Sequence, residues 1–328
     1  MDRDQELFEH YKFIADRGQD PLRVDRFLLN FIENATRNKI QRSIKDGFVF
    51  VNGKSVKSNY KVKAGDVVTV EFLNPKRDKI LIPQDIPIDI QYEDDDIIIV
   101  NKEAGMVVHP GFGNYDGTLV NGLAFHFKNL PNMGDETRPG LVHRIDKNTS
   151  GILVIAKNDR SMSIMGDKFL RRDLDRRYYA LVWGDFDEDE GTIVGHIGRS
   201  HKNRKIMDVF EDGEYGKEAI TNWKVIERFG YTTLVECKLE TGRTHQIRVH
   251  LKHKGTSILG DQQYGKKNIK FKKINGDFFN ILKNINGQAL HAQTLEFLHP
   301  IKKKWMSFKA PHPNDFKKML NYLSKLTG

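Results

Sequence analysis

The first part of the chain shows two short helical patterns followed by alternating strands. Apolar residues recur at helical spacing in VDRFLLNFI (24–32), and RNKIQRSIKDG (37–47) follows a threonine suited to cap a second helix. FVFVNGKSV (48–56) alternates apolar and polar positions around Asn-Gly, a dipeptide preferred in tight hairpins, and KAGDVVTVEF (63–72) is a further strand pattern. This order predicts a small unit of two helices and several strands over 21–72.

The flanks of this unit have different patterns. Residues 1–20 carry six acidic against three basic residues and no clear strand or turn pattern, so we expect a mobile or loosely docked arm. Residues 73–87, LNPKRDKILIPQDIP, hold three prolines and mixed charge, which is typical of an extended linker. A chain of 328 residues exceeds the usual size of one domain, which favours a second, larger domain over 88–328.

Short β-rich runs dominate the chain beyond the linker. They are separated by Gly, Asn and Asp turns, with helical patterns between some of them, which indicates an α+β domain dominated by its sheet. The runs that we interpret as strand-like are IDIQYEDDDIIIVNK (88–102), GILVIAK (151–157), YYALVWG (178–184), YTTLVECKLE (231–240) and HQIRVHL (245–251).

Positive charge is concentrated in two parts of the chain. The formal net charge is +9, and 22–72 carries ten Lys or Arg against five acidic residues. From residue 266 to the C-terminus there are 13 lysines against three acidic residues, and the lysine-rich stretch 266–287 has the character of an insertion between core elements. Clustered cations favour a polyanionic partner because binding releases its counterions. Basic surfaces are common, however, so charge alone does not identify a nucleic acid.

Composition excludes several other kinds of protein and site. Cys237 is the only cysteine, so one chain cannot form an internal disulfide or a cysteine-rich zinc site, which fits a reducing compartment. The N-terminus is charged where a signal peptide needs an apolar core, and no apolar run approaches the roughly 18 residues that span a bilayer. His245 and His250, five positions apart, cannot easily share an ion. We expect a cytoplasmic protein without membrane segments or metal.

The strongest candidate for chemistry is HRIDKNTSG (143–151). It places Asp146 before a tight Thr-Ser-Gly turn and a strand apolar enough to be buried, which should hold the acid at an edge of the core rather than in an exposed ion pair. It is not a kinase catalytic loop, because an isoleucine separates Arg144 from Asp146 and no DFG is present. A partly buried acid needs a nearby cation to stay ionised, and TGRTHQIRVH offers Arg243 and Arg248.

Four motifs, in this order after the first unit, resemble the RluA-type RNA pseudouridine synthases: HRIDKNTSG, RRYYALVWG, TGRTHQIRVH and QALHAQTLEFLHP. Within that family, VVHPGFGNYDGTLVNGL (107–123) is most similar to the RluD branch, which acts on large-subunit ribosomal RNA. RVDRFL and FVFVNGK in 21–72 resemble the S4 domain, an RNA-binding module. The resemblance implies an S4 domain followed by a catalytic domain over 88–328 with a mixed, mainly antiparallel sheet core flanked by helices.

The resemblance also implies an activity that needs no cofactor. A uridine in RNA is flipped out, its N-glycosidic bond is broken, and the uracil is rejoined to the ribose through carbon 5. Asp146 matches the catalytic aspartate, Tyr178 the tyrosine that stacks on the uracil and takes part in proton transfer, and Arg243 the arginine that pairs with the aspartate. Attack on the sugar, stabilisation of its positive charge and removal of a sugar proton all remain open as roles of Asp146.

The other candidate residues are expected to contact RNA, with the histidine in a supporting position. They are Lys39, Arg42, Arg138, His143, Arg144, Arg248 and Lys272. We expect the partner to be large-subunit ribosomal RNA, naked or within precursor particles, and the enzyme to be a monomer. A transfer-RNA enzyme of the same family and a non-catalytic RNA-binding protein of ribosome assembly are the alternatives. Arg176 stands in the tyrosine motif where the family more usually has lysine.

Overall fold

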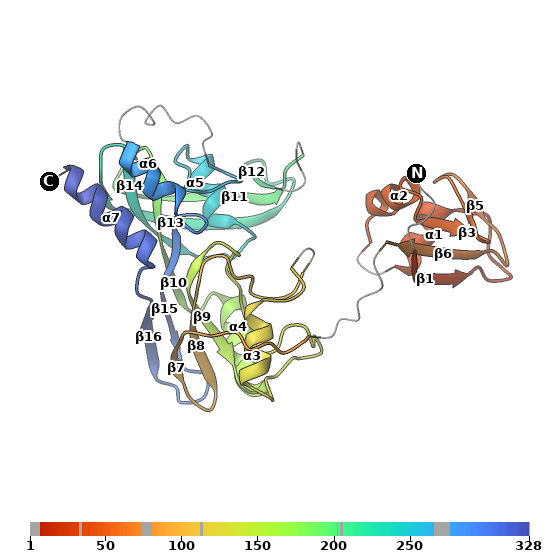
Figure 1. The fold of residues 1–328 in the computed structure, drawn as a ribbon, viewed down its shortest axis with the longest axis horizontal. Helices are drawn as coiled ribbons and strands as arrows, with labels where there is room; N and C mark the ends of the chain where they lie inside the picture. Colours follow the sequence, from red (N-terminus) through yellow and green to blue (C-terminus); the bar gives the residue numbers. More distant parts are fainter. Residues whose placement is uncertain are drawn as a thin grey trace. The chain divides into compact units, whose positions relative to one another are not determined.

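The computed structural model divides the chain into two compact units, 1–79 and 80–328, which we describe separately (Figure 1). The residues that the structure describes are 7–32, 35–73, 81–111, 114–201, 203, 206–265 and 276–327. No helix within these ranges is both long enough and apolar enough to cross a membrane.

The first unit packs two helices against a small antiparallel sheet. Its elements are β1 (Phe8–Ile14), β2 (Leu22–Arg23), α1 (Val24–Phe31), α2 (Arg37–Lys45), β3 (Val49–Val51), β4 (Lys54–Ser55), β5 (Lys61–Val62) and β6 (Val67–Phe72). The sheet order is β1-β6-β3-β4, and β2 pairs with β5. Phe27 and Leu28 of α1 and Ile40 of α2 are buried in one core cluster, as the helical spacing predicted.

The prediction of a mobile or loosely docked arm over 1–20 is wrong for Phe8–Ile14. These residues form β1, which pairs antiparallel with β6 and places Phe13 opposite Val68. The pattern was missed because a register shift between Glu9 and Tyr11 breaks the period-two alternation, which leaves the apolar residues Tyr11 and Ile14 exposed. Its partner strand lies more than fifty positions away in the sequence, so the pairing is decided by tertiary structure.

The linker is shorter than the predicted 73–87, because the second half of this segment packs on the second unit. The backbone N–H of Gln84 donates to the carbonyl of Asn121 at 3.0 Å, and the Asn121 amide donates to the carbonyl of Ile82 at 2.8 Å. The Asn121 side chain also completes a capping box with Thr118. One buried asparagine thus fixes the start of the second unit.

The second unit is built on one large mixed sheet. Its strands are β7 (Ile90–Glu93), β8 (Ile97–Lys102), β9 (Ser150–Ala156), β10 (Asp175–Trp183), β11 (Glu190–Arg199), β12 (Met207–Phe210), β13 (Lys217–Arg228), β14 (Thr232–Leu239), β15 (Leu290–Leu298) and β16 (Trp305–Lys309). The order is β12-β11-β13-β14-β10-β15-β9-β8-β7, with β16 beside β15. The β9–β15 pair is parallel and the other described pairs are antiparallel, which confirms the predicted architecture.

Helices flank this sheet (Figure 1). They are α3 (Leu119–His126), α4 (Asp159–Arg171), α5 (Gln246–His253), α6 (Gly276–Lys283) and α7 (Asn314–Thr327). α4 contacts β9, α5 contacts β11, β12 and β13, and α6 packs against α7. The expected insertion, 266–287, therefore includes a docked helix. Phe278 of α6 is buried with its ring edge-on to Trp183, at 6.0 Å between centroids.

The prediction of a strand for HQIRVHL is wrong. This run forms most of the helix α5. Its residues from Gln246 to Leu251 are all buried. When every face of a short segment is covered, apolar and polar positions no longer separate at a helical period, so the pattern cannot distinguish a helix from a strand. This helix carries Arg248 into the centre of the unit.

The parallel pairing of β9 with β15 joins two sequence motifs. Ser150 lies opposite His291 and Gly151 opposite Ala292, and the Ser150 hydroxyl lies 2.8 Å from Nδ1 of His291. Gly151 has φ +115°, and a Cβ atom there would overlap the carbonyl oxygen of Ala292. Only glycine permits this close approach, which fixes the loop carrying Asp146 beside the central strands.

Candidate active site

A cavity of about 510 Å³ lies where four parts of the second unit meet. These are the HRIDKNTSG loop, the end of α4, strand β10, and the segment that joins β14 to α5. The side chains considered below that line the cavity are His143, Arg144, Asp146, Arg176, Tyr178, Arg243 and Arg248. Leu290 of QALHAQTLEFLHP also lines it, so the structure gathers all four sequence motifs around one space.

Asp146 lies in a turn at the cavity wall. The backbone N–H of Thr149 donates to the Asp146 carbonyl at 3.1 Å, and the neighbouring Ile145 is 5% exposed, which anchors the turn in the core. The Asp146 side chain is 20% exposed. Its Oδ2 accepts a hydrogen bond from Nη1 of Arg248 at 3.0 Å. The acid is thus partly buried, open to the cavity, and paired with a cation.

Arg248 holds two acids at once. Its Nε and Nη2 form a two-point contact with Asp261, at 2.7 and 3.0 Å, and Nη2 also donates to Gln263 at 2.9 Å. The guanidinium lies 4.8 Å from the ring centroid of Tyr264, a favourable cation–π distance. This arrangement fixes the orientation of the one nitrogen that reaches Asp146.

Charge balance supports this arrangement. Burial works to raise the pKa of Asp261, but the hydrogen bonds and charge of Arg248 outweigh burial and hold that pKa below its usual value. Burial also works to lower the pKa of Arg248, and the contacts with Asp261 and Asp146 raise it instead. At neutral pH, Arg248 and Asp261 therefore form a buried charged pair that presents positive charge to Asp146.

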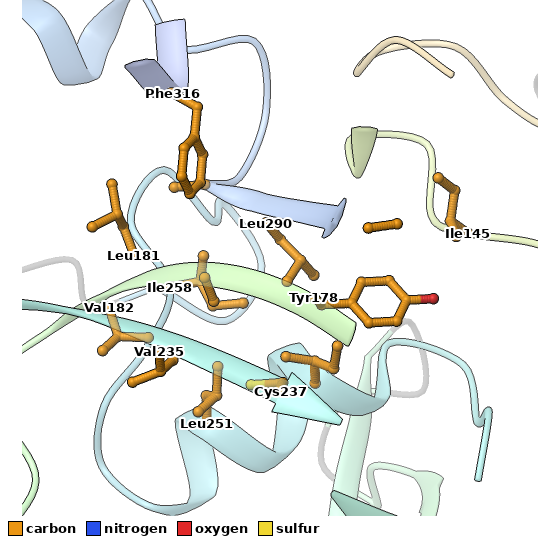
Figure 2. Close-up of a cluster of buried hydrophobic side chains, with 14 of the residues drawn as sticks. Ile145, Tyr178, Leu181, Val182, Val235, Cys237, Leu251, Ile258, Leu290 and Phe316 are labelled. Carbon is orange, nitrogen blue, oxygen red and sulfur yellow. The ribbon is translucent and has the colours of Figure 1, made fainter. Parts of the chain in front are cut away.

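Tyr178 lies at the boundary between this cavity and the apolar core. It is 7% exposed and belongs to the main core cluster. Figure 2 shows it at the end of the cluster, with its hydroxyl directed away from Leu290 and Leu181. Burial raises the pKa of the hydroxyl, with opposite contributions from Arg176 and Asp146, so the phenol stays protonated at neutral pH. In the sheet, Tyr178 of β10 lies opposite Ala292 of β15, and Ala292 lies opposite Gly151 of β9. Strand pairing therefore brings the motifs of Tyr178, Ala292 and Gly151 side by side.

The predicted pairing of Arg243 with Asp146 is wrong. Arg243 lines the cavity, but its Nε donates to the carbonyl of Glu218 at 2.8 Å. The chain turns into α5 through His245, which has φ +57°, and the Gln246 side chain accepts from the Arg243 backbone N–H at 2.9 Å. This reversal directs Arg243 toward β13 and brings Arg248, expected to contact RNA, against Asp146 instead.

His143 supports the site rather than facing RNA with its nitrogens. Its Nε2 accepts the backbone N–H of Val154 at 3.0 Å, its Nδ1 is buried, and its ring stacks on Phe169 at 4.3 Å. Burial, followed by the charge of Arg176, lowers the pKa of His143 to about 3. The neutral ring therefore ties the HRIDKNTSG loop to β9, in the supporting position expected of it, and its nitrogens face the protein rather than RNA.

The remaining predicted RNA contacts are exposed or lie outside the described residues. Arg144 is exposed and its Nη1 lies 3.5 Å from His109 Nε2, while Arg138 pairs with Asp135 at 3.3 Å. In the first unit, Lys39 and Arg42 are exposed on α2. Lys272 falls in 266–275, outside the described residues.

The histidines of TGRTHQIRVH bind separate hydroxyl groups. His250 Nδ1 is 2.9 Å from the hydroxyl of Thr221, and His245 Nδ1 is 2.8 Å from that of Tyr264. Within the described ranges, the group with suitable spacing for a metal ion contains Asp94, Asp96 and His299. There, Oδ2 of Asp94 already accepts from Lys302 at 2.7 Å and lies 2.9 Å from His299, so an internal ion-pair network accounts for the group.

Sequence reasoning missed two residues around Asp146. One is Asp261, described above, whose only sequence signal is an acid directly after the apolar SILG. The other is Lys102, which is 2% exposed and donates from Nζ to the carbonyls of Glu103, Met106 and Lys147 at 2.6 to 3.1 Å. It ties the end of β8 to the residue that follows Asp146. A lysine at the end of an apolar strand run was its only signal.

Comparisons with known proteins agree with these features. Residues 96–253 match the family described as RNA pseudouridylate synthase, and residues 22–68 match the S4 domain. A Chlorobaculum parvum protein named as an RNA pseudouridine synthase is 49% identical over 312 residues, covering 93% of this chain and 95% of that protein. A Zymomonas mobilis protein named ribosomal large subunit pseudouridine synthase D is 41% identical, covering 92% and 93% of the two chains.

The fold agrees as well. The solved structure of human RNA pseudouridylate synthase domain containing 4 aligns with a TM-score of 0.57 at 24% identity, over 72% of this chain and 93% of that one. The predicted resemblance is therefore confirmed. The chain belongs to the RNA pseudouridylate synthase family and carries an S4 domain at its N-terminus.

Proposed function

We propose that this isomerase converts uridines of large-subunit ribosomal RNA to pseudouridine, with Asp146 as its catalytic carboxylate. The observation that carries the proposal is the Asp146 side chain, which is open to a nucleoside-sized cavity and paired at 3.0 Å with a buried guanidinium. Ribosomal RNA is favoured because several relatives are named for the large ribosomal subunit and because an S4 domain is present.

The position of Asp146 requires the target uridine to leave its base stack. A glycosidic bond inside a helix cannot reach a carboxylate in a cavity wall, so the nucleotide must be flipped out at a cost of about a few kcal/mol. Phosphate contacts to exposed Arg138 and Arg144, together with stacking on Tyr178, offset this cost. The S4 unit contributes further phosphate contacts through Lys39 and Arg42.

The reaction then proceeds without a change in overall composition. The bond between uracil N1 and ribose C1′ breaks, the base turns, and a C5–C1′ bond forms while C5 loses its proton and N1 gains one. Asp146 acts on the ribose, where positive charge develops. Tyr178 stacks on the uracil, and its protonated hydroxyl lies on the cavity side to take part in proton transfer at C5.

Arg248 is the positioning residue of this site. Because its other nitrogens are bound by Asp261, it cannot swing away from Asp146 without breaking a two-point contact. It directs one oxygen of the Asp146 carboxylate toward itself, which leaves the other for the substrate. This role replaces the one expected of Arg243.

The test uses large-subunit ribosomal RNA transcripts labelled with tritium at carbon 5 of uridine, because isomerisation releases that tritium to water. We expect release with the wild type and none with Asp146→Asn, a near-isosteric change. The exposed Asp187→Asn variant is the matched control and should react like the wild type. Equal release from Asp146→Asn would exclude Asp146 as the catalytic group.

The alternatives are separated by the same assay. Release from transfer RNA but not from ribosomal transcripts would show a transfer-RNA enzyme of the family. Tight binding of ribosomal RNA with no release by the wild type, from naked transcripts or from precursor particles, would indicate a non-catalytic role in ribosome assembly. Primer extension over the modified product then identifies the target uridine.

A further inference from the structure

Arg176 lines the same cavity as Tyr178 and Asp146. Both Arg176 and Tyr178 are buried on β10, and residues two apart on a strand face the same side. The Arg176 guanidinium lies over the Phe169 ring at 5.4 Å, and Nη1 lies 3.2 Å from the point where a Cβ atom of residue 242 would be. It therefore spans the cavity between the end of α4 and the loop before α5.

Among the described residues, no acidic side chain pairs with this buried guanidinium. Arg176 is 9% exposed, its Nε is buried with no hydrogen-bond partner, and it forms no ion pair or hydrogen bond with the described residues. Arg248, in the same cavity, is satisfied by two carboxylates. A buried charge left without compensation is costly in the free protein, and an arginine does not escape that cost by losing its proton at neutral pH.

The surroundings keep the guanidinium open to a ligand. Gly242 has no side chain that could cover Nη1, and the guanidinium carbon lies 5.4 Å from the centre of the Phe169 ring. Arg172 and Arg243 line the cavity beside it and are held through Glu218, by its carboxylate and its carbonyl respectively. A polyanion that enters along this side meets positive charge at the rim and then the buried Arg176.

We propose that Arg176 is the binding site for a phosphate of the everted nucleotide. This inference rests on the proposed function, since it assumes an RNA strand in the cavity. With the ribose at Asp146 and the uracil on Tyr178, the part of the cavity lining formed by Arg176, Phe169 and Gly242 is left for the strand that continues from the target. A phosphate carries a full negative charge before reaction begins, whereas uracil is neutral, and a guanidinium fork matches phosphate oxygens.

The test combines Arg176→Gln with short RNA substrates that carry a neutral methylphosphonate at either phosphate flanking the target uridine. In the wild type, one of the two neutral linkages is expected to weaken binding about tenfold, the range of a charge-assisted hydrogen bond. Arg176→Gln is expected to bind the normal RNA about tenfold more weakly and to show no further loss with that linkage. Arg176→Lys should fall between the two, because lysine supplies the charge without the fork.

Two controls keep this test decisive. Arg177→Gln alters the next arginine, which faces the other side of β10 and pairs with Asp175 and Glu236, so it should keep the wild-type linkage effect. Arg176→Gln should be at least as thermally stable as the wild type, because it removes an unpaired buried charge. In steady state, its defect should appear in KM with kcat nearly unchanged.

Two outcomes would overturn the inference: an Arg176→Gln enzyme that remains as sensitive as the wild type to both neutral linkages, or one that loses kcat with KM unchanged. Binding is also measured in the Asp146→Asn background, where turnover plays no part. Suppose that, in this background, the loss of binding caused by the neutral linkage depends on Arg176 while the wild type releases no tritium. The phosphate site then stands and the proposed catalytic function fails. The reverse pattern retains the catalytic function and rejects the phosphate site.

Discussion

Arg248 donates one hydrogen bond to Asp146, at 3.0 Å, while its remaining nitrogens bind groups deeper in the protein. The pair is therefore asymmetric: the arginine is fixed by the fold, and the aspartate is fixed by the arginine. Because Asp261 has no exposed side-chain surface and already compensates the guanidinium, Asp146 adds negative charge that the substrate can use.

We predict that Arg248→Met abolishes activity and destabilises the second unit. It leaves Asp261 buried and unpaired, which typically costs about 3–5 kcal/mol of unfolding free energy. Urea unfolding followed by circular dichroism measures the loss. Arg248→Lys retains one charge but cannot hold both acids, so it should be intermediate. Loss of activity with unchanged stability in Arg248→Met would contradict the structural pairing with Asp261.

Arg243→Gln should behave differently from Arg248→Met. Arg243 binds a backbone carbonyl at the cavity rim, so its removal should change the unfolding free energy by less than about 1 kcal/mol. We expect weaker RNA binding with an active Asp146, measured as a higher KM with kcat within about threefold of the wild type. A complete loss of kcat would mean that Arg243 acts on the reacting groups after all.

Salt dependence should reveal the S4 contacts. Lys39→Gln and Arg42→Gln each remove one exposed charge from α2, so each should lower the slope of log binding constant against log salt by about one. Filter binding from 50 to 300 mM salt, roughly the range in which such slopes are read, gives the measurement. Glu71→Gln on β6 is a charge-changing control that should not reduce the slope. An unchanged slope in both α2 variants would remove this helix from the RNA interface.

Acid should weaken the fold through His291. Burial, assisted by His312, lowers the pKa of His291 from 6.5 to about 4. Between pH 6.5 and about 4, His291 is therefore protonated in the unfolded chain but neutral in the folded chain. The free energy of unfolding present above pH 6.5 is thus lost as the pH falls toward 4. The contribution between pH 7 and 5 is about 2 kcal/mol.

His291→Gln should be less stable than the wild type at pH 7. Its free energy of unfolding should, however, fall by about 2 kcal/mol less between pH 7 and 5, as measured by urea unfolding at each pH. The matched control is His126→Gln, which alters an exposed histidine on α3 and should keep the wild-type slope. An equally steep decline in His291→Gln would show that other groups control acid stability.

Gly151→Ala should disrupt the parallel pairing of β9 with β15, which holds the Asp146 loop beside the central strands. Alanine would combine an unfavourable positive φ with overlap of the Ala292 carbonyl, so we expect a loss of at least about 3 kcal/mol and of activity. Gly230 also has positive φ, +76°, but open space around it. Gly230→Ala should therefore cost only about 1 kcal/mol. Equal costs in thermal unfolding would mean that the β9–β15 register tolerates displacement.

The sequence alone determined the features that depend on local pattern or on several motifs together. Helical spacing in 24–32, the Asn-Gly hairpin at 52–53 and the apolar strand 151–157 predicted elements that the structure contains. The helix buries one face, the hairpin turns sharply by itself, and the strand is a short apolar run buried along its whole length. The order of four motifs predicted the family, and the tight turn after Asp146 predicted an acid at the edge of the core.

Tertiary structure decided which groups meet. The partner of Asp146 could not be read from TGRTHQIRVH, because its two arginines differ only in where the chain turns through His245. β1 depends on pairing with β6, α5 is covered on every side, and Asp261 reaches Arg248 from a separate loop. Each of these depends on contacts between distant segments, whose energies no local window of sequence contains.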